Sequence, residues 1–146
     1  MIVLDTTVLV YAVGVVHPLR EPCRVLIGAV GDGTVAATTT VEVIQELAHL
    51  RASRRGRADA AGLARDYAAL LAPLLVVAEQ DLRAGLDLFE GHDDLGAFDA
   101  VLAATAIRND VAGLVSTDRA FANVDGLTHI DPASPDLLAR LGNTAG

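Results

Sequence analysis

Hydrophobic and polar positions divide this chain into two kinds of segment. Short apolar runs rich in β-branched residues predict strands, at residues 2–4, 34–38, 74–77, 113–116 and 127–130, with 34–38 the weakest of them. Longer stretches in which apolar positions recur at helical spacing predict helices, at residues 7–13, 19–30, 40–53, 58–71, 79–90, 97–109 and 135–141. Strands and helices therefore alternate along the chain.

The predicted strands are apolar on both faces, which is typical of a parallel sheet covered by helices on its two sides. We therefore expect an α/β fold with three layers, α/β/α. The 146 residues suit a single domain spanning 1–146, because no repeat, low-complexity tract or change of composition marks a linker. Residues 143–146 are expected to fray.

The amino-acid composition limits the compartment in which this protein is expected to act and the reactions that its side chains can support. The single cysteine, Cys23, is expected to be a buried thiol in a reducing cytoplasm, and the uncharged run at 6–19 is too short to cross a membrane. All eleven basic residues are arginine, so the absence of lysine excludes a P-loop and Schiff-base chemistry. The formal net charge of −8 argues against general attraction to nucleic acid, so any RNA contact needs a local basic patch.

Two aspartates follow predicted strands. Asp5 comes directly after the run at 2–4, and Asp118 follows the run at 113–116. The carboxyl ends of parallel strands form the functional edge of such a sheet, so the two carboxylates converge if the strands are neighbours. The alternative interpretation is that each aspartate only caps the helix that follows it.

Asp99 is the only charged residue between residues 95 and 107, in a segment that is otherwise apolar on every side. Such a helix is expected to be buried. A carboxylate there costs several kcal/mol unless it is paired, hydrogen-bonded or bound to a metal. The alternative is a first-turn aspartate that is stabilised by backbone N–H groups and the helix dipole.

The helix predicted at 40–53 carries two acids one turn apart, Glu42 and Glu46. With Thr39 as the N-cap, Glu42 would complete a capping box, which explains it structurally. Glu46 has no such role and lies at the border of the buried arc of the helix. We therefore favour Glu46 as the functional acid.

Four carboxylates in one crevice would raise one another's pKa unless a cation is present. Oxygen-only ligands suit Mg²⁺ or Mn²⁺, and the histidines at 17, 49, 92 and 129 show no ligand spacing. The candidate metal ligands are Asp5, Glu46, Asp99 and Asp118.

The ordered set of motifs resembles the PIN-domain family, in particular its VapC-type toxins. The chain has Ile-Val-Leu-Asp-Thr at 2–6, Glu-Leu at 46–47, Phe-Asp-Ala-Val-Leu-Ala-Ala-Thr-Ala at 98–106 and Val-Ser-Thr-Asp-Arg-Ala-Phe at 115–121. No single motif is specific, but the set spans nearly the whole chain.

The resemblance implies a parallel sheet of about five strands in the order 3-2-1-4-5. It implies that Asp5, Glu46, Asp99 and Asp118 hold one or two Mg²⁺ or Mn²⁺ ions and that a metal-activated water hydrolyses RNA phosphodiesters. It further implies a homodimer and a small cognate protein antitoxin. Many relatives carry another aspartate where this chain has Ala120, so the number of ions stays open.

Arg51, Arg54, Arg55 and Arg57 form the one dense basic cluster and are candidate RNA contacts. The alternative is a solvated helix end whose cations complement the helix dipole. Two rival functions also stay open, a DNA-cleaving PIN-like nuclease and a non-catalytic PIN-like binding module.

Overall fold

The computed structural model describes residues 1–142. The expectation that residues 143–146 fray lies outside the described residues. In chain order the elements are β1 (Ile2–Leu4), α1 (Thr6–Val13), α2 (Arg20–Gly31), β2 (Ala37–Thr38), α3 (Val41–Arg55), α4 (Arg57–Leu70), α5 (Glu79–Gly91), α6 (Ala97–Arg108), β3 (Gly113–Val115), the 3₁₀ helix η1 (Arg119–Asn123), β4 (His129–Ile130) and α7 (Leu137–Gly142).

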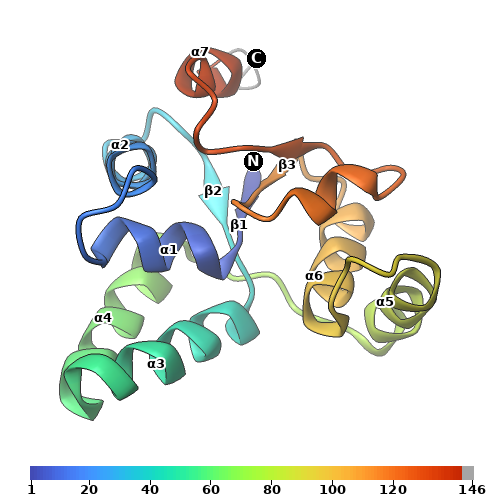
Figure 1. Cartoon of the computed structure of the whole chain (residues 1–146), viewed down its shortest axis with the longest axis horizontal. Coiled ribbons are helices and arrows are strands. Elements are labelled where there is room, and N and C mark those ends of the chain that lie inside the picture. The colour runs from blue at the N-terminus through green and yellow to red at the C-terminus, as the bar shows by residue number, and fades with distance from the viewer. Residues whose placement is uncertain (143–146) are drawn as a thin grey trace.

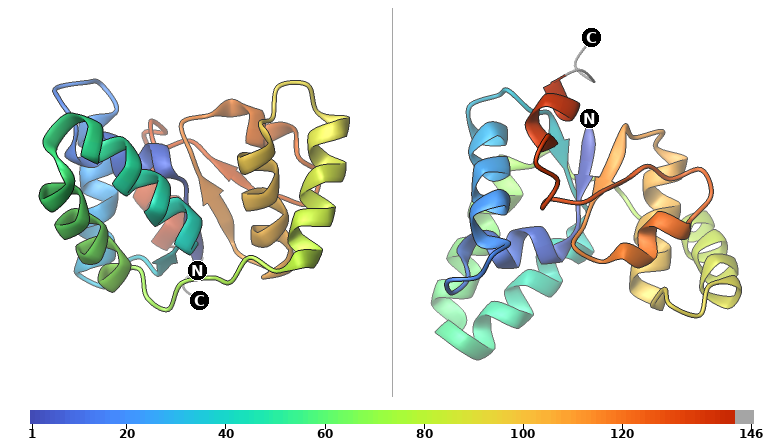
Figure 2. Two further views of the ribbon diagram at one scale, coloured as in Figure 1. Left: turned by 90° about the horizontal axis from the view of Figure 1, so that it is seen from below. Right: turned by 45° about the horizontal axis from the view of Figure 1, so that its top comes forward.

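The strands form one parallel sheet in the order β2-β1-β3-β4. Ile2 pairs with Ala37 on one side and with Gly113 on the other, and Leu114 pairs with His129. Helices α1 to α4 lie on one side of the strands and α5 and α6 on the other (Figures 1 and 2). The predicted α/β fold with helices on both faces is confirmed.

The predicted sheet of five strands is wrong by one strand. Residues 74–77 form no strand, and only an isolated parallel bridge joins Leu75 to Thr40. Leu75 N–H donates to the Thr39 carbonyl at 2.9 Å, but the Val76 carbonyl accepts from Arg108 Nη2 at 2.8 Å, and just beyond the segment Ala78 N–H donates to Asp81 at 2.7 Å. Because β2 itself has only two residues, it offers little edge for a further strand.

The core is built on the two central strands. All three residues of β1 are buried, as are Leu114 and Val115 of β3. Helix α5 approaches α6 so closely at Gly85 that an added Cβ would lie 2.7 Å from the Val101 Cα, which explains the glycine. No helix within residues 1–142 is both long and apolar enough to span a membrane.

Helix α6 is less buried than expected. Ala100, Ala103, Ala104 and Ala106 are buried, but Phe98 is 40% exposed and Ile107 is 37% exposed. One side of this apolar helix therefore reaches the surface.

Candidate active site

The ends of β1 and β3 bring Asp5 and Asp118 to one edge of the sheet. The two strands are direct neighbours, and Asp5 N–H donates to the Val115 carbonyl at 3.0 Å. Asp118 lies three residues after Val115, where it is the N-cap of η1. The prediction that these strands are adjacent is confirmed.

The Asp5 carboxylate is almost completely buried, with 3% of the residue exposed. Its Oδ2 accepts hydrogen bonds from Ser116 Oγ at 2.7 Å and Thr7 Oγ1 at 3.0 Å, and its Oδ1 accepts from Thr6 N–H at 2.7 Å. Burial raises the pKa of Asp5, and the negative charge of Glu46 adds to this, although the three hydrogen bonds act in the opposite direction.

Glu46 reaches this group from α3. Its Oε2 accepts a hydrogen bond of 2.6 Å from the Thr6 hydroxyl, directly beside Asp5. The charge of Glu46 raises the pKa of both Asp5 and Asp99, so its carboxylate lies within electrostatic reach of both.

The capping box expected for Glu42 is wrong. Helix α3 is capped by Thr40, whose hydroxyl accepts from Val43 N–H at 3.2 Å, whereas Thr39 Oγ1 donates to the Leu4 carbonyl at 2.7 Å. The tether to β1 therefore takes the Thr39 hydroxyl away from the helix end. Glu42 Oε2 is buried without a hydrogen-bond partner among residues 1–142.

Asp99 lies in the first turn of α6 and is the most perturbed acid of the group. Its pKa is raised to about 7, first by burial and then by the charges of Asp5, Asp118 and Glu46. The structure thus brings all four predicted carboxylates together. Within residues 1–142 no donor forms a hydrogen bond with the Asp99 side chain, so the alternative of a carboxylate bonded to backbone N–H groups is wrong.

The two strand-end aspartates are also helix caps. Asp5 is the N-cap of α1, and Asp118 Oδ1 accepts from Ala120 N–H at 2.9 Å as the cap of η1. The capping hydrogen bond uses only the Oδ1 atom of each aspartate, so capping is compatible with a place for both aspartates in the acidic group. Asp94, two residues before Gly96, accepts from the Asn123 amide at 3.1 Å, and Gly96 is the N-cap of α6.

Ser116 and Thr7 are parts of this site that sequence reasoning missed or left without a role. The buried Ser116 hydroxyl donates to Asp5 and accepts from Asp118 N–H at 3.0 Å, so one side chain connects both strand ends. Thr7 Oγ1 accepts from Thr117 N–H at 3.3 Å while it donates to Asp5. The available signal was the position of these hydroxyl residues next to acids at the ends of strands.

The donor set fits a hard divalent cation by its chemistry. The converging side chains offer carboxylate oxygens only, and their mutual repulsion favours a bound positive charge. No three His, Cys, Asp or Glu side chains of residues 1–142 already stand as a set of metal ligands. Closure around an ion would therefore require side-chain rotations.

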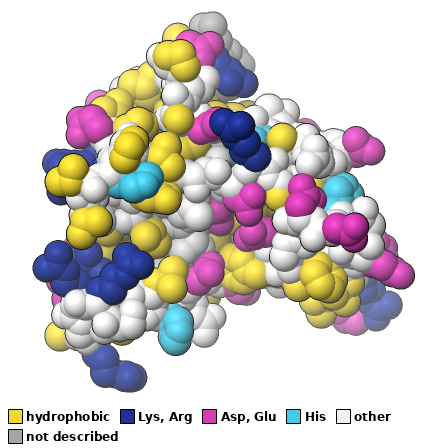
Figure 3. All heavy atoms as spheres, viewed as in Figure 1, with side chains coloured by type: hydrophobic (Ala, Val, Ile, Leu, Met, Phe, Trp, Pro, Cys, Tyr) yellow, Lys and Arg dark blue, Asp and Glu magenta, His cyan; other side chains and the backbone are white. Residues whose placement is uncertain are grey.

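Acidic side chains gather in the middle of the face shown in Figure 3, and basic side chains lie at its lower left, over α3 and α4. Among the candidate RNA contacts, Arg51 is already bound: its Nε lies 2.6 Å from Asp59, and its side chain is 20% exposed. Arg54, Arg55 and Arg57 are exposed. Arg54 and Arg55 occupy the last turn of α3, as the helix-dipole alternative requires.

A family model described as the PIN domain matches residues 2–127. Ribonuclease VapC7 of Mycobacterium tuberculosis is 48% identical over 147 aligned positions, which cover 98% of this chain and 99% of that protein. Ribonuclease VapC23 of the same species is 30% identical and covers 84% of this chain and 97% of that protein. A chain in the crystal structure of VapBC2 from Rickettsia felis, bound to a DNA fragment from its promoter, has the same fold, with a TM-score of 0.69 at 16% identity over 90% of this chain and 98% of that one.

Proposed function

This chain belongs to the PIN-domain family, and we propose that it is a metal-dependent endoribonuclease of the VapC type, the toxin of a toxin–antitoxin pair. The relatives that match nearly its full length are named ribonucleases, which supports RNA as the substrate. The reaction is hydrolysis of an RNA phosphodiester.

The observation that carries this proposal is the gathering of four carboxylates, none of which forms an ion pair with a basic side chain of residues 1–142. Burial, and then three neighbouring negative charges, raise the pKa of Asp99 to about 7. Carboxylates that repel one another in this way are typical of a place where a cation binds. A purely structural role would not require four acids at one point.

In this proposal Asp5, Glu46, Asp99 and Asp118 hold one or two Mg²⁺ or Mn²⁺ ions. When bound, the ion supplies an activated water and offsets charge on the phosphate and the leaving oxygen. The chain prepares the site: Ser116 and Thr7 fix the Asp5 Oδ2, and Thr6 orients Glu46. Asp99, whose pKa is raised to about 7, would bind the ion as a charged carboxylate, so binding would release any proton that it holds.

The proposed partners follow from the same charges. A small antitoxin would cover the acidic crevice with a segment that places an arginine there, since a guanidinium matches carboxylates well. Arg54, Arg55 and Arg57 are exposed and would contact RNA phosphates, whereas Arg51 would first have to leave Asp59. We further propose that the protein acts in the cytoplasm as a homodimer.

Cleavage of purified RNA tests the activity. Wild-type protein should cleave total RNA with Mg²⁺ or Mn²⁺ and stop with chelator, and Asp99→Asn should lose at least about 100-fold of the rate, since it removes a charged ligand. The control Asp66→Asn changes an exposed acid of α4 and should retain activity. Mapping the ends of the RNA fragments would identify the phosphodiester bond that is cut.

Three results would contradict the proposal: full activity in folded Asp99→Asn, cleavage unaffected by chelator, or cleavage of single-stranded DNA but not of RNA of the same sequence. The last result would favour the DNA-cleaving alternative. Binding of RNA without cleavage under any metal would favour the binding module.

A further inference from the structure

The parallel ladder between β3 and β4 runs out at Ser116. Leu114 pairs with His129, and just beyond the strands Ser116 N–H donates to the Ile130 carbonyl at 3.2 Å. In a parallel pair the next bond would run from the backbone N–H of residue 132 to the Ser116 carbonyl. Residue 132 is a proline, which has no backbone N–H. The backbone of the neighbouring strand therefore cannot supply this donor.

The side chain of His129 takes the place of the missing donor. Its Nε2 lies 2.9 Å from the Ser116 carbonyl oxygen. A carbonyl can only accept a hydrogen bond, so Nε2 carries the proton. The imidazole ring also stacks on Phe121 of η1, with the ring centroids 6.4 Å apart and the planes inclined by 23°. His129 thus makes two separate contacts, a hydrogen bond to the residue after β3 and a ring contact to η1.

The peptide unit between Ser116 and Thr117 carries the effect of His129 toward the acidic crevice. Its carbonyl accepts from His129, and its N–H donates to Thr7 Oγ1 at 3.3 Å. Because a peptide unit is planar, these two bonds on opposite sides fix its orientation. Thr7 Oγ1 itself donates to Asp5 Oδ2 at 3.0 Å, so the peptide unit is tied to one of the crevice acids.

The side chain of Ser116 connects the same peptide unit to both strand-end acids. Its hydroxyl is buried, donates to Asp5 Oδ2 at 2.7 Å and accepts from Asp118 N–H at 3.0 Å. We propose that His129 is a positioning residue of the acidic crevice: by holding the Ser116 carbonyl, it fixes Asp5 and Asp118 for the ion. The inference rests on the proposed metal-dependent function and adds to it a residue that acts only through Ser116.

Two substitutions at His129 separate the hydrogen bond from the ring contact. His129→Phe keeps a ring beside Phe121 and loses the donor. His129→Gln loses the ring and keeps an N–H donor in the place of Nε2. If His129 served only to pack against η1, the Gln variant would be the more damaged of the two. If it positions the acids through its donor, the Phe variant is the more damaged.

Calorimetric titration with Mn²⁺ measures the effect on the site. We expect His129→Phe to bind Mn²⁺ about tenfold more weakly than wild type and His129→Gln to stay within about threefold, since partners that orient metal ligands have effects of this size. His49→Phe is the matched control, because His49 is exposed on α3 and its loss should leave the affinity unchanged. Melting curves in chelator establish that each variant is folded.

A second measurement needs no metal. The N–H groups of Thr117 and Asp118 bond to the hydroxyls of Thr7 and Ser116, so their hydrogen exchange reports the order of this peptide segment. In chelator the exchange should be several-fold faster in His129→Phe than in wild type, and His129→Gln should retain most of the protection. Unchanged exchange in His129→Phe would overturn the inference.

The affinities separate failure of this inference from failure of the proposed function. If wild type binds Mn²⁺ and His129→Phe binds it equally well, His129 does not position the acids and the proposed nuclease still stands. A loss as large in His129→Gln as in His129→Phe, or a similar loss in His49→Phe, would overturn the role of the donor in the same way. Wild type that binds no Mn²⁺ would contradict the metal-dependent function, and this inference with it.

Discussion

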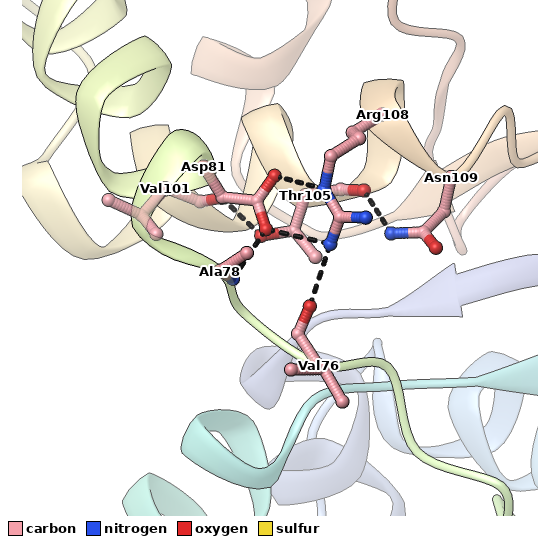
Figure 4. A network of polar contacts seen from close by, with 7 residues as sticks. All are labelled: Val76, Ala78, Asp81, Val101, Thr105, Arg108 and Asn109. Atoms are coloured by element: carbon pink, nitrogen blue, oxygen red, sulfur yellow. Dashed lines mark hydrogen bonds and ion pairs between the residues drawn. The ribbon is translucent and has the colours of Figure 1, made fainter.

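Asp81 and Asp99 lie on two helices that pack against each other, and only Asp81 has a cation. Asp81 is 1% exposed and accepts hydrogen bonds from Arg108 Nε at 2.6 Å, Arg108 Nη2 at 2.9 Å and Ala78 N–H at 2.7 Å (Figure 4). The hydrogen bonds from Arg108 lower the pKa of Asp81 below its usual range. The pKa of Asp99 moves the other way, to about 7.

Asp81 stabilises the fold through its ion pair with Arg108, whereas the crevice acids repel one another in the folded protein. Arg108 belongs to the same chain as Asp81, so their pairing is complete as soon as α5 and α6 pack. The same arginine binds the Val76 carbonyl and so also fixes the segment that leads into α5. The crevice acids have hydroxyl partners but no basic side chain within the described residues forms an ion pair with them. The negative charge of the crevice acids is therefore available to a positively charged partner from solution.

The same substitution at the two positions should change stability in opposite directions. Asp81→Asn leaves the Arg108 guanidinium without its counter-charge, and we expect Tm to fall by roughly 5–10 °C in chelator at pH 8. Asp99→Asn removes a repelled charge and should raise Tm under the same conditions. Differential scanning calorimetry of the two variants and wild type measures both effects. A fall of Tm in both variants would show that Asp99, like Asp81, is paired in the folded protein.

The pH dependence of stability should sharpen the comparison. The pKa of Asp99 is higher in the folded than in the unfolded protein, so the folded state binds more protons between about pH 4 and pH 7. The stability of the metal-free protein should therefore fall as pH rises through this range, by on the order of 1 to 2 kcal/mol from this group, because solvent screens its partly exposed charge. The lowered pKa of Asp81 has the opposite sign: its contribution is present above the unfolded value and is lost in acid.

The measurement is the difference in unfolding free energy between wild type and Asp99→Asn at several pH values, in chelator. The variant should become progressively more stable than wild type between pH 4 and pH 7, and the difference should level off above that. Mn²⁺ should reverse the order of the two proteins at pH 7. A difference that does not vary with pH would contradict the raised pKa.

The crevice could be predicted from sequence and the Asp81–Arg108 pair could not. Asp5 stands directly after an apolar strand, Asp118 stands shortly after another, and Asp99 is a single charge in an apolar helix, so local pattern sufficed to propose them. Asp81 and Arg108 are 27 residues apart, and their contact depends on how α5 crosses α6. No local pattern encodes that crossing.

The errors in the predicted fold have the same origin. Residues 74–77 have the composition of a strand, but Arg108 donates to the Val76 carbonyl. The segment forms only a single β-bridge, between Leu75 and Thr40. From sequence alone, Thr39 and Thr40 are equally suited to cap α3. Thr40 is the cap because the Thr39 hydroxyl donates to the Leu4 carbonyl instead. In both cases a tertiary hydrogen bond overrides a local preference.

Ser116 shows how far a neutral partner can replace a cation. Its hydroxyl donates to Asp5 as Arg108 does to Asp81, but it brings no charge. Ser116→Ala should raise the pKa of Asp5 further and weaken Mn²⁺ binding about tenfold, because ligand-orienting partners contribute this much at metal sites. Ser116→Thr should retain most of the affinity, and Ser53→Ala, at the exposed end of α3, should have no effect. Calorimetric titration with Mn²⁺ measures all three, and an unchanged affinity in Ser116→Ala would show that its hydroxyl serves the fold alone.

The smallest expected effect extends the comparison from acids to arginines. Arg51 is paired with Asp59, whereas Arg54, one turn nearer the end of α3, forms no ion pair within residues 1–142. Arg54→Gln should weaken RNA binding a few-fold at low salt and reduce the slope of log affinity against log salt by about one, since one phosphate contact is lost. Arg51→Gln should leave that slope nearly unchanged and lower stability slightly instead, because its guanidinium already serves Asp59. Fluorescence anisotropy in the inactive Asp99→Asn background, over a series of salt concentrations, measures binding without cleavage. If Arg51→Gln changes the slope and Arg54→Gln does not, RNA draws Arg51 away from Asp59, and an ion pair in the free protein does not mark an arginine as structural.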